Sequence, residues 1–310
     1  MHIRTNPKLN KLFKPLIVFC EWLGEHHPIL LARIRYFARF KKPLNLRNPQ
    51  TLNEKMLFLS LKTDTTLWTR CADKYAVRDY VKECGLEDIL IPLIGVWDRA
   101  KDIDFNALPN EFVLKANHGS GDILVVTDKS KLDIPQVVEM FEKDLSQRYG
   151  ALESGHHYMR IVPRMIAEEL IHNDEETQKI SFSLIDYKIW CFNGKCHYIW
   201  ACANRDEHST EVMTYDPDWT AHPEYSIFED GYRHGELLPK PKNLERMIEV
   251  AEKLSAPFPC VRVDLYNVSG KIYFGELTFT SYGGMMDFHT EEFQKLAGSQ
   301  LDISEVEVIR

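Results

Sequence analysis

The stretch Phe112-Val113-Leu114-Lys115-Ala116-Asn117-His118-Gly119-Ser120-Gly121-Asp122 combines an apolar strand with a short glycine-containing loop. The strand delivers Lys115 to the edge of the loop, and Gly119 and Gly121 let backbone N–H groups approach phosphate oxygens closely. No Gly-Lys-Ser/Thr follows at Walker A spacing, so that phosphate-binding motif is excluded. Two interpretations stay open at this point, a phosphate loop or a plain hairpin turn leading into a partner strand at residues 122–126.

Outside this stretch, the residue patterns predict short strands, mostly arranged as hairpins. Asn193-Gly194 and Ser269-Gly270 are typical two-residue hairpin turns. The expected fold class is therefore α+β with mainly antiparallel sheets. Strands are predicted over residues 89–97, 163–171, 184–192, 195–203, 259–266 and 271–279, and helices over 135–149 and 243–254.

Helical patterns dominate the region before the first predicted strand. Thr51-Leu52-Asn53-Glu54 has the form of a capping box, with Thr51 as the cap and Glu54 three residues later, and predicts a helix through about Leu61. A further helix is predicted from about Asp73 to Cys84, closed by Gly85. The first fifty residues indicate one or two helices with aromatic and basic character, ended by prolines at positions 43 and 49.

Two acidic residues are predicted to meet across a hairpin. Arg262 and Asp264 share one face of the predicted strand 259–266, and Glu276 and Thr278 share one face of the strand 271–279. Two neighbouring carboxylates repel each other unless a cation joins them, and oxygen ligands of this kind suit Mg²⁺ that carries phosphates. A cross-strand ion pair of Arg262 with either acid explains the same residues equally well.

Composition indicates a globular protein of ordinary type. The 310 residues are 44% hydrophobic and 27% charged, and no run of 18 or more apolar residues occurs, so no transmembrane helix is expected. The seven cysteines are scattered and form no Cys-x-x-Cys pair, which favours buried reduced thiols over zinc or disulfides. We therefore expect a cytoplasmic location.

Charge is distributed unevenly along the chain. Residues 1–50 carry ten Lys/Arg and two acids, a balance of +8, whereas the whole chain has a net charge of −8 and the remainder therefore carries −16. Such a basic segment is expected either to contact an anionic surface, such as a membrane leaflet, or to pack on the acidic body of the protein.

Other motifs are weaker. The histidine pairs at 26–27 and 156–157 lack the i,i+4 spacing of helical metal ligands, so solvated or packing roles are favoured. Asp216-Pro217-Asp218 and Asp102-Ile103-Asp104 have the Asp-x-Asp form used by glycosyltransferases, but turns explain both better. No Gly-x-Ser-x-Gly elbow is present.

The order and spacing of the motifs over roughly residues 48–298 resemble the TupA-like branch of the ATP-grasp superfamily, found in bacterial surface-polysaccharide gene clusters. The resemblance implies an ATP-grasp fold in which two mainly antiparallel lobes hold the nucleotide. The matching stretches are residues 48–55, 72–78, 112–121, 166–170, 186–194, 261–266 and 273–279.

The resemblance implies a role for each matching residue. Lys74 and Lys115 correspond to the lysines that contact ATP phosphates, and Arg262 to the arginine that steadies the reacting phosphate; Arg262 and Lys115 are the expected catalytic residues. The implied nucleotide-binding residues are Lys74, Lys115, His118, Gly119, Ser120, Gly121, Glu168, Glu169, Leu170 and Lys188. The implied metal ligands are Asp264, Glu276 and Thr278, although Thr278 stands where many ATP-grasp enzymes have asparagine.

The resemblance also implies a function and a domain layout. An ADP-forming carboxylate–amine ligase is expected, using ATP and Mg²⁺ to join an amine or amino acid to a uronic acid of a capsule or O-antigen, with no nucleic-acid partner. A glycosyltransferase and a non-catalytic ATP-binding scaffold are the alternatives. Peripheral contact with an anionic membrane, at the inner leaflet, is expected through residues 1–47. The expected lobes are residues 48–110, an ATP-grasp small lobe at 111–172 and a large lobe at 173–310.

Overall fold

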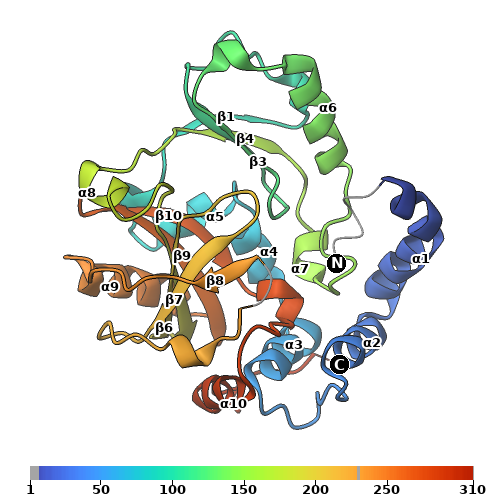
Figure 1. The fold of residues 1–310 in the computed structure, drawn as a ribbon. Helices are drawn as coiled ribbons and strands as arrows, with labels where there is room; N and C mark the ends of the chain where they lie inside the picture. The colour runs from blue at the N-terminus through green and yellow to red at the C-terminus, as the bar shows by residue number, and fades with distance from the viewer. Residues whose placement is uncertain (1–6, 229–230, 310) are drawn as a thin grey trace.

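The structure, a computed structural model, describes residues 7–228 and 231–309, so the first six residues of the predicted basic segment lie outside the described part. Across the described residues the strands form one sheet of four strands and one of six. Helices cover the sheets and form the N-terminal edge of the molecule (Figure 1). The predicted α+β class with mainly antiparallel sheets is confirmed.

The four-stranded sheet has the order β1-β4-β2-β3, and each pair of neighbours is antiparallel. Helix α6 packs over it, and its core includes Phe112, Leu114, Phe141 and Met165. Because β1 belongs to this sheet, the sheet begins before residue 111, where the small lobe was expected to start. The elements are β1 (Leu93–Trp97), β2 (Phe112–Ala116), β3 (Ile123–Val126), β4 (Met165–Glu168) and α6 (Ile134–Leu145).

The six-stranded sheet has the order β10-β9-β5-β6-β7-β8, antiparallel except between β7 and β8. Asn193-Gly194 and Ser269-Gly270 form the two predicted hairpin turns, and all four residues have positive φ. Strands β7 and β8 and helix α10 were not predicted. The elements are β5 (Asp186–Phe192), β6 (Lys195–Ala203), β7 (Thr210–Tyr215), β8 (Tyr232–His234), β9 (Cys260–Val268), β10 (Lys271–Thr278), α9 (Leu244–Ser255), α10 (Glu291–Gln300) and the short helix α8 (Glu175–Gln178).

The two faces of the larger sheet differ in chemistry because successive side chains point to opposite sides. Ile189, Val263 and Leu277 belong to the main core, which includes residues of α9. Arg262 and Asp264 occupy the alternate positions of β9. The apolar face is thus covered by α9, and the polar residues of the same strands lie on the opposite face.

The helices before β1 follow the prediction in part, and α4 (Thr66–Ala72) was not predicted. Thr51 and Glu54 form the predicted capping box at the start of α3. The helix predicted from Asp73, however, begins only at Val77: the Asp73 carboxylate accepts N–H groups of Tyr75 and Ala76 and holds a turn there. The helices are α1 (Pro7–His26), α2 (Pro28–Phe40), α3 (Leu52–Lys62), α4 (Thr66–Ala72) and α5 (Val77–Glu83), and α7 (His156–Met159) follows later in the chain.

Two expectations from composition concern membrane-spanning helices and the cysteines. In the part of the chain that is described, no helix is both long enough and apolar enough to cross a membrane. All seven cysteines are unpaired, and five of them are buried while Cys20 and Cys84 are partly exposed. The prediction of unpaired, mostly buried thiols is confirmed.

Candidate active site

The loop after β2 is held at its base by Asn117, whose side chain is completely buried. Its amide nitrogen donates to Asp73 Oδ1 at 2.9 Å and to the Val162 carbonyl at 3.0 Å, and its oxygen accepts the Arg164 N–H at 2.7 Å. The Lys74 N–H donates to the Asn117 carbonyl at 3.0 Å. The loop therefore starts from a rigid point shared with the turn before α5.

Glycine suits two positions of this loop. Gly121 has a φ of +86°, a conformation that other residues rarely adopt. A Cβ atom at Gly119 would lie 1.9 Å from Asp122 Oδ2, so a larger residue would displace that carboxylate. Ser120 between them is exposed, whereas His118 is buried, and burial lowers the pKa of its imidazole. Because burial lowers this pKa, His118 is neutral at neutral pH and supports the loop from its buried side.

Lys115 projects from β2 onto the face that it shares with Glu168 of β4. Its Nζ lies 2.6 Å from Glu168 Oε2, and Arg78 Nη1 lies 3.1 Å from the other oxygen of the same carboxylate. Both lysine and glutamate side chains are largely buried, at 15% and 8% exposure. Glu168 is therefore a buried acid between two cations, which positions the Lys115 ammonium at the start of the loop.

Glu168, Glu169 and Leu170, which the resemblance implies bind the nucleotide, lie where the chain leaves β4 for the larger sheet. The Glu169 N–H donates to the Pro92 carbonyl at 3.1 Å. Within the described residues the Leu170 amide and carbonyl make no backbone hydrogen bond. These free groups are of the kind that pairs with the edge of a planar base.

Lys74 connects the two sheets. Its ammonium donates to the Gly119 carbonyl at 2.5 Å and lies 4.0 Å from Glu276 Oε2. The first contact is with the loop of the smaller sheet, and the second is with strand β10 of the larger one. Lys74 thus contacts both the loop after β2 and the acidic strand, although it lies in a turn and not on the predicted helix.

The register of β9 and β10 places Glu276 directly opposite Asp264 and Thr278 opposite Arg262. This register depends on a β-bulge at Gly275, between Phe274 and Glu276. In a regular strand Glu276 would share the face of Phe274, which belongs to the apolar core. The bulge moves Glu276 to the opposite face, beside Asp264. A Cβ atom at Gly275 would lie 3.0 Å from the Asp264 carbonyl oxygen, so glycine suits this close approach.

Arg262 lies at the centre of the polar face. Its Nε and Nη2 each donate to Asp264 at 2.7 Å, and Nη2 also lies 3.1 Å from Thr278 Oγ1 and 3.3 Å from Glu276 Oε1. Its Nη1 donates to Ser281 Oγ at 2.7 Å. The ion pairing that the sequence left as an open interpretation is therefore present: Arg262 pairs with Glu276 across the strands and with Asp264 on its own strand.

Lys188 adds a second cation to Asp264. Its Nζ lies 2.5 Å from Asp264 Oδ2 and 2.6 Å from Asp186 Oδ2, and Arg205 approaches Asp186 at 3.3 Å. Burial lowers the pKa of the Lys188 ammonium, but Asp186 and Asp264 outweigh this effect and raise the pKa overall. Lys188 thus remains charged on the strand next to β9.

Glu276 is the more accessible acid, with a side chain that is 38% exposed, against 3% for Asp264. Partial burial raises the pKa of the Glu276 carboxyl, but Lys74 and then Arg262 outweigh it and lower the pKa to about 2. Burial likewise raises the pKa of Asp264, against the opposing effect of Arg262 and Lys188. Glu276 is therefore ionised and open to a ligand at neutral pH.

The donor set fits a magnesium ion that arrives with phosphates. Among the described residues no group of three or more His, Cys, Asp or Glu side chains is placed to hold a metal by itself. Mg²⁺ commonly takes one or two carboxylates and completes its shell with water and phosphate oxygens. Glu276 offers an exposed carboxylate, and Asp264 Oδ1, which accepts only the Arg262 Nε–H, keeps a lone pair. Thr278 Oγ1 donates to Glu276 at 2.8 Å and orients that carboxylate.

The weaker motifs have structural roles. Asp216 and Asp218 both accept the Thr220 N–H, and Asp104 accepts the Asn106 N–H, so both Asp-x-Asp motifs form turns as predicted. His157 is completely buried, and His156 bonds to the Gly24 carbonyl. These histidines pack, as predicted.

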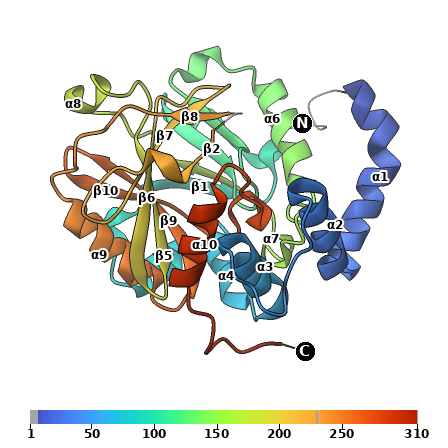
Figure 2. The same cartoon turned by 60° about the horizontal axis from the view of Figure 1, so that its bottom comes forward.

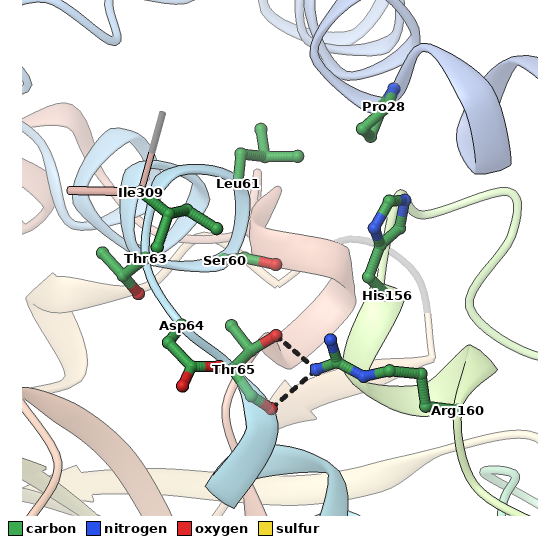
Figure 3. A pocket seen from close by; sticks show the side chains of 9 residues that line it. All are labelled: Pro28, Ser60, Leu61, Thr63, Asp64, Thr65, His156, Arg160 and Ile309. Atoms are coloured by element: carbon green, nitrogen blue, oxygen red, sulfur yellow. Dashed lines mark hydrogen bonds between the residues drawn. The ribbon is translucent and has the colours of Figure 1, made fainter.

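A small pocket lies away from this site, between the N-terminal helices and the body (Figure 3). Its volume is about 90 Å³, below the several hundred Å³ typical of ligand pockets. Arg160 spans it and donates to the carbonyl and hydroxyl oxygens of Thr65 at 2.8 and 2.7 Å. We assign it a packing role. The pocket is lined by Pro28, Ser60, Leu61, Thr63, Asp64, Thr65, His156, Arg160 and Ile309.

Three residues that sequence patterns did not single out complete the site. Arg78 pairs with Glu168, Asp186 pairs with Lys188, and Gly275 forms the bulge. Asp186 and Lys188 are two residues apart on one strand, so their shared face was available from the pattern. Glycine inside a strand is also a known sign of a bulge. The pairing of Arg78 across 90 positions has no local signal.

The family model described as TupA-like ATPgrasp matches residues 54–302. No curated protein sequence matches the chain.

Solved structures provide distant similarities. A D-alanine–D-alanine ligase from Bacillus anthracis is 17% identical, with a TM-score of 0.46, over 77% of this chain and 66% of that one. An L-amino acid ligase from Bacillus licheniformis is 14% identical, with a TM-score of 0.48, over 90% and 63%. A D-alanine–D-alanine ligase from Helicobacter pylori is 12% identical, with a TM-score of 0.44, over 83% and 68%. The chain thus spans slightly less than two thirds of the length of the first two proteins.

Proposed function

The chain belongs to the TupA-like ATP-grasp family, and from this premise we propose that it is a cytoplasmic, ADP-forming carboxylate–amine ligase. In this proposal ATP and Mg²⁺ activate a uronic acid carboxylate of a bacterial surface polysaccharide. An amine, such as that of an amino acid, is then joined to this carboxylate through an amide bond. The ligase chemistry is supported by the residues of the site. The two substrate classes follow from the family resemblance.

The observation that carries the proposal is the cluster of Lys74, Arg262 and Lys188 around Glu276 and Asp264. Lys74 lies 4.0 Å from Glu276, Arg262 contacts both acids, and Lys188 contacts Asp264. Fixed cations held by a buried network need little reorganisation when a phosphoryl group arrives. The cluster therefore suits the stabilisation of charge on a phosphate in transfer.

The proposed reaction has two steps. A carboxylate oxygen of the acceptor attacks the γ-phosphorus of ATP, so that an acyl–phosphate bond forms and ADP leaves. The amine nitrogen then attacks the acyl carbon, inorganic phosphate leaves, and the nitrogen loses a proton. Lys74 and Lys115 bind and orient phosphates, and Arg262 stabilises the oxygens that gain charge. Glu276, Asp264 and the Thr278 hydroxyl would hold magnesium, which when bound neutralises charge on the phosphates.

A substrate panel tests the proposal. Purified protein is incubated with Mg-ATP, an amine mixture and either uronates or the matching neutral sugars, and ADP release is measured. We expect release only with the uronates, and hydroxylamine in place of the amine should give a hydroxamate from the acyl phosphate. No ADP with any uronate and amine would contradict the ligase proposal, and stabilisation by a UDP-sugar but not ATP would favour the glycosyltransferase alternative.

A variant of Arg262 tests the site itself. Arg262→Lys keeps the charge but cannot make the paired hydrogen bonds to Asp264, so ADP release should fall by about 100-fold. Arg246→Lys on the exposed side of α9 is the matched control and should leave the rate unchanged. Equal rates for both variants would remove Arg262 from the proposed mechanism.

A further inference from the structure

Helices α1 and α2 lie at the edge of the molecule (Figure 2), and both helices expose large apolar side chains. Their exposed fractions lie between 44% and 58%. On α2 they are spaced by four and three residues, so they form one stripe along the helix. On α1, Trp22 stacks on Phe19 with ring centroids 6.1 Å apart. The residues are Leu16, Phe19, Trp22, Leu30, Ile34 and Phe37.

The inner side of α2 and the C-terminal end of α1 are packed, so the exposed stripe on α2 is not a sign of a missing core. Leu31, Ala32 and Tyr36 of α2 are buried, and the last two belong to a core that also includes Leu57 of α3. This region is integral to the fold, and removal of residues 1–45 would expose that core. Point variants are therefore better suited than a deletion to test its surface.

The segment 148–156 fixes the hairpin of α1 and α2 in place. Arg35 donates to the Leu152 carbonyl at 2.6 Å, and Ser154 to the Pro28 carbonyl at 3.0 Å. A Cβ atom at Gly24 would lie 1.7 Å from the Ala151 carbonyl oxygen, which shows how closely α1 approaches this segment. The hairpin is thus attached by its inner side, and the apolar residues face outward.

Cations accompany the apolar stripe. Lys14, Arg33 and Lys41 are exposed, and none of them forms an ion pair with a carboxylate among the described residues. Arg39 and Lys42, by contrast, pair with Asp287 and Glu291 of the body. The expected packing of the basic segment on the acidic body is therefore present for Arg39 and Lys42, and Lys14, Arg33 and Lys41 remain available to an outside partner.

We propose that the α1–α2 hairpin docks on the surface of an anionic phospholipid bilayer. Apolar side chains with tryptophan and phenylalanine enter the headgroup region, and flanking lysine and arginine attract anionic lipid. Charge favours this occupant over a second copy of the chain, because a second copy would bring an equally basic stripe that does not compensate these cations. The α1–α2 hairpin would lie in the plane of the membrane–water interface, since no described helix can span a bilayer.

Docking has a consequence for the candidate active site. Tyr149, in the segment that supports the hairpin, lies beside the phosphate loop, with its Cδ2 3.8 Å from a Cβ position at Gly119. Lipid contact therefore holds the phosphate loop near the bilayer surface. This arrangement suits a substrate that is itself held at the membrane.

Vesicle co-sedimentation of the full chain tests the docking. We expect binding to mixed phosphatidylglycerol–phosphatidylcholine vesicles, and little to phosphatidylcholine alone. The variant Leu30→Ser, Ile34→Ser, Phe37→Ser should lose most binding. Arg33→Glu with Lys41→Glu should weaken it by at least about 30-fold, from about 1 kcal/mol for each of the two cations lost. Matched controls with similar exposure elsewhere are Val162→Ser, Phe182→Ser, Leu237→Ser and, for charge, Lys179→Glu with Lys242→Glu.

Trp22 provides a local readout, because it is the exposed one among the six tryptophans. Brominated lipid should quench the fluorescence of the unchanged protein, and Trp22→Phe should remove most of that quenching. Full binding by the serine variant, absence of quenching, or a dimer in light scattering that the serine variant abolishes would each overturn the proposal. The last result would assign the stripe to a second copy of the chain.

Discussion

Arg262 shows how strongly one residue can determine a site. Its guanidinium contacts Asp264, Glu276, Thr278 and Ser281, from three successive segments of the chain. Burial lowers the pKa of Arg262, but Asp264 outweighs it and raises the pKa, so the residue stays charged. A permanent cation between two acids keeps both carboxylates close together before any ligand arrives.

His157 illustrates a different use of burial. It packs edge-on against Trp68, with ring centroids 5.5 Å apart, and lies 4.1 Å from the Tyr158 ring. Burial lowers the pKa of its imidazole to about 3. A base with a lowered pKa in the folded state is protonated more readily after unfolding. Its destabilising effect is therefore absent above pH 6.5 and grows as the pH falls toward 3.

At the residue scale we predict that His157→Phe reduces the acid sensitivity of the protein. Between pH 7.5 and 5.0 the unchanged protein should lose about 2 kcal/mol of unfolding free energy through this histidine, and the variant should not. Urea denaturation at the two pH values measures the difference. His172→Asn, at a histidine with a 62% exposed side chain, is the control and should keep the full pH dependence. An unchanged pH dependence in His157→Phe would contradict the prediction.

At the scale of elements, the bulge at Gly275 determines on which face Glu276 lies. Phe274 pairs with Leu265, both in the core, and Glu276 pairs with Asp264 on the polar face. A one-residue change of register exchanges the faces of a strand. The site therefore depends on one extra residue in β10.

We predict that Gly275→Val lowers ADP release by about 100-fold, because its side chain meets the Asp264 carbonyl, pushes β9 and β10 apart by at least a few tenths of an ångström and misplaces Asp264 and Glu276. The fold should remain, with a lower unfolding free energy. Tyr273→Phe on the same strand is the control for general effects on β10. Normal ADP release by Gly275→Val would contradict the prediction, because activity would then not depend on glycine at the bulge.

At the scale of the whole molecule, Lys74 joins the two sheets. The smaller sheet supplies the loop and Lys115, the larger sheet supplies the acids, and Lys74 contacts both parts from a turn between α4 and α5. In Figure 1 this turn lies where the two sheets face each other. The division into lobes remains a prediction, with β1 now included in the smaller sheet.

We predict that Lys74→Met weakens the binding of Mg-ATP by about tenfold or more, since a charged hydrogen bond contributes about 1.5–3 kcal/mol. Isothermal titration calorimetry measures this affinity. Lys101→Met, at an exposed lysine of the smaller sheet region, is the matched control and should bind normally. Equal affinities of the two variants would limit Lys74 to a structural role.

Local features of this protein were available from its sequence. The capping box at Thr51, the strand with Lys115 and its glycine loop, and the hairpins at Asn193 and Ser269 depend on residues a few positions apart. The family model supports the resemblance inferred from the motifs. The adjacency of Asp264 and Glu276 was also predicted correctly.

Tertiary structure decided the rest, because those contacts join residues far apart in the chain. The turn around Lys74, the pairing of Lys115 and Arg78 with Glu168, and the outward stripe on α1 and α2 depend on what each element packs against. The Ser269-Gly270 turn alone sets a regular register that would place Glu276 in the apolar core. The bulge at Gly275 changes that register, and it is stable because a buried carboxylate among apolar side chains would cost far more than one displaced residue in a strand.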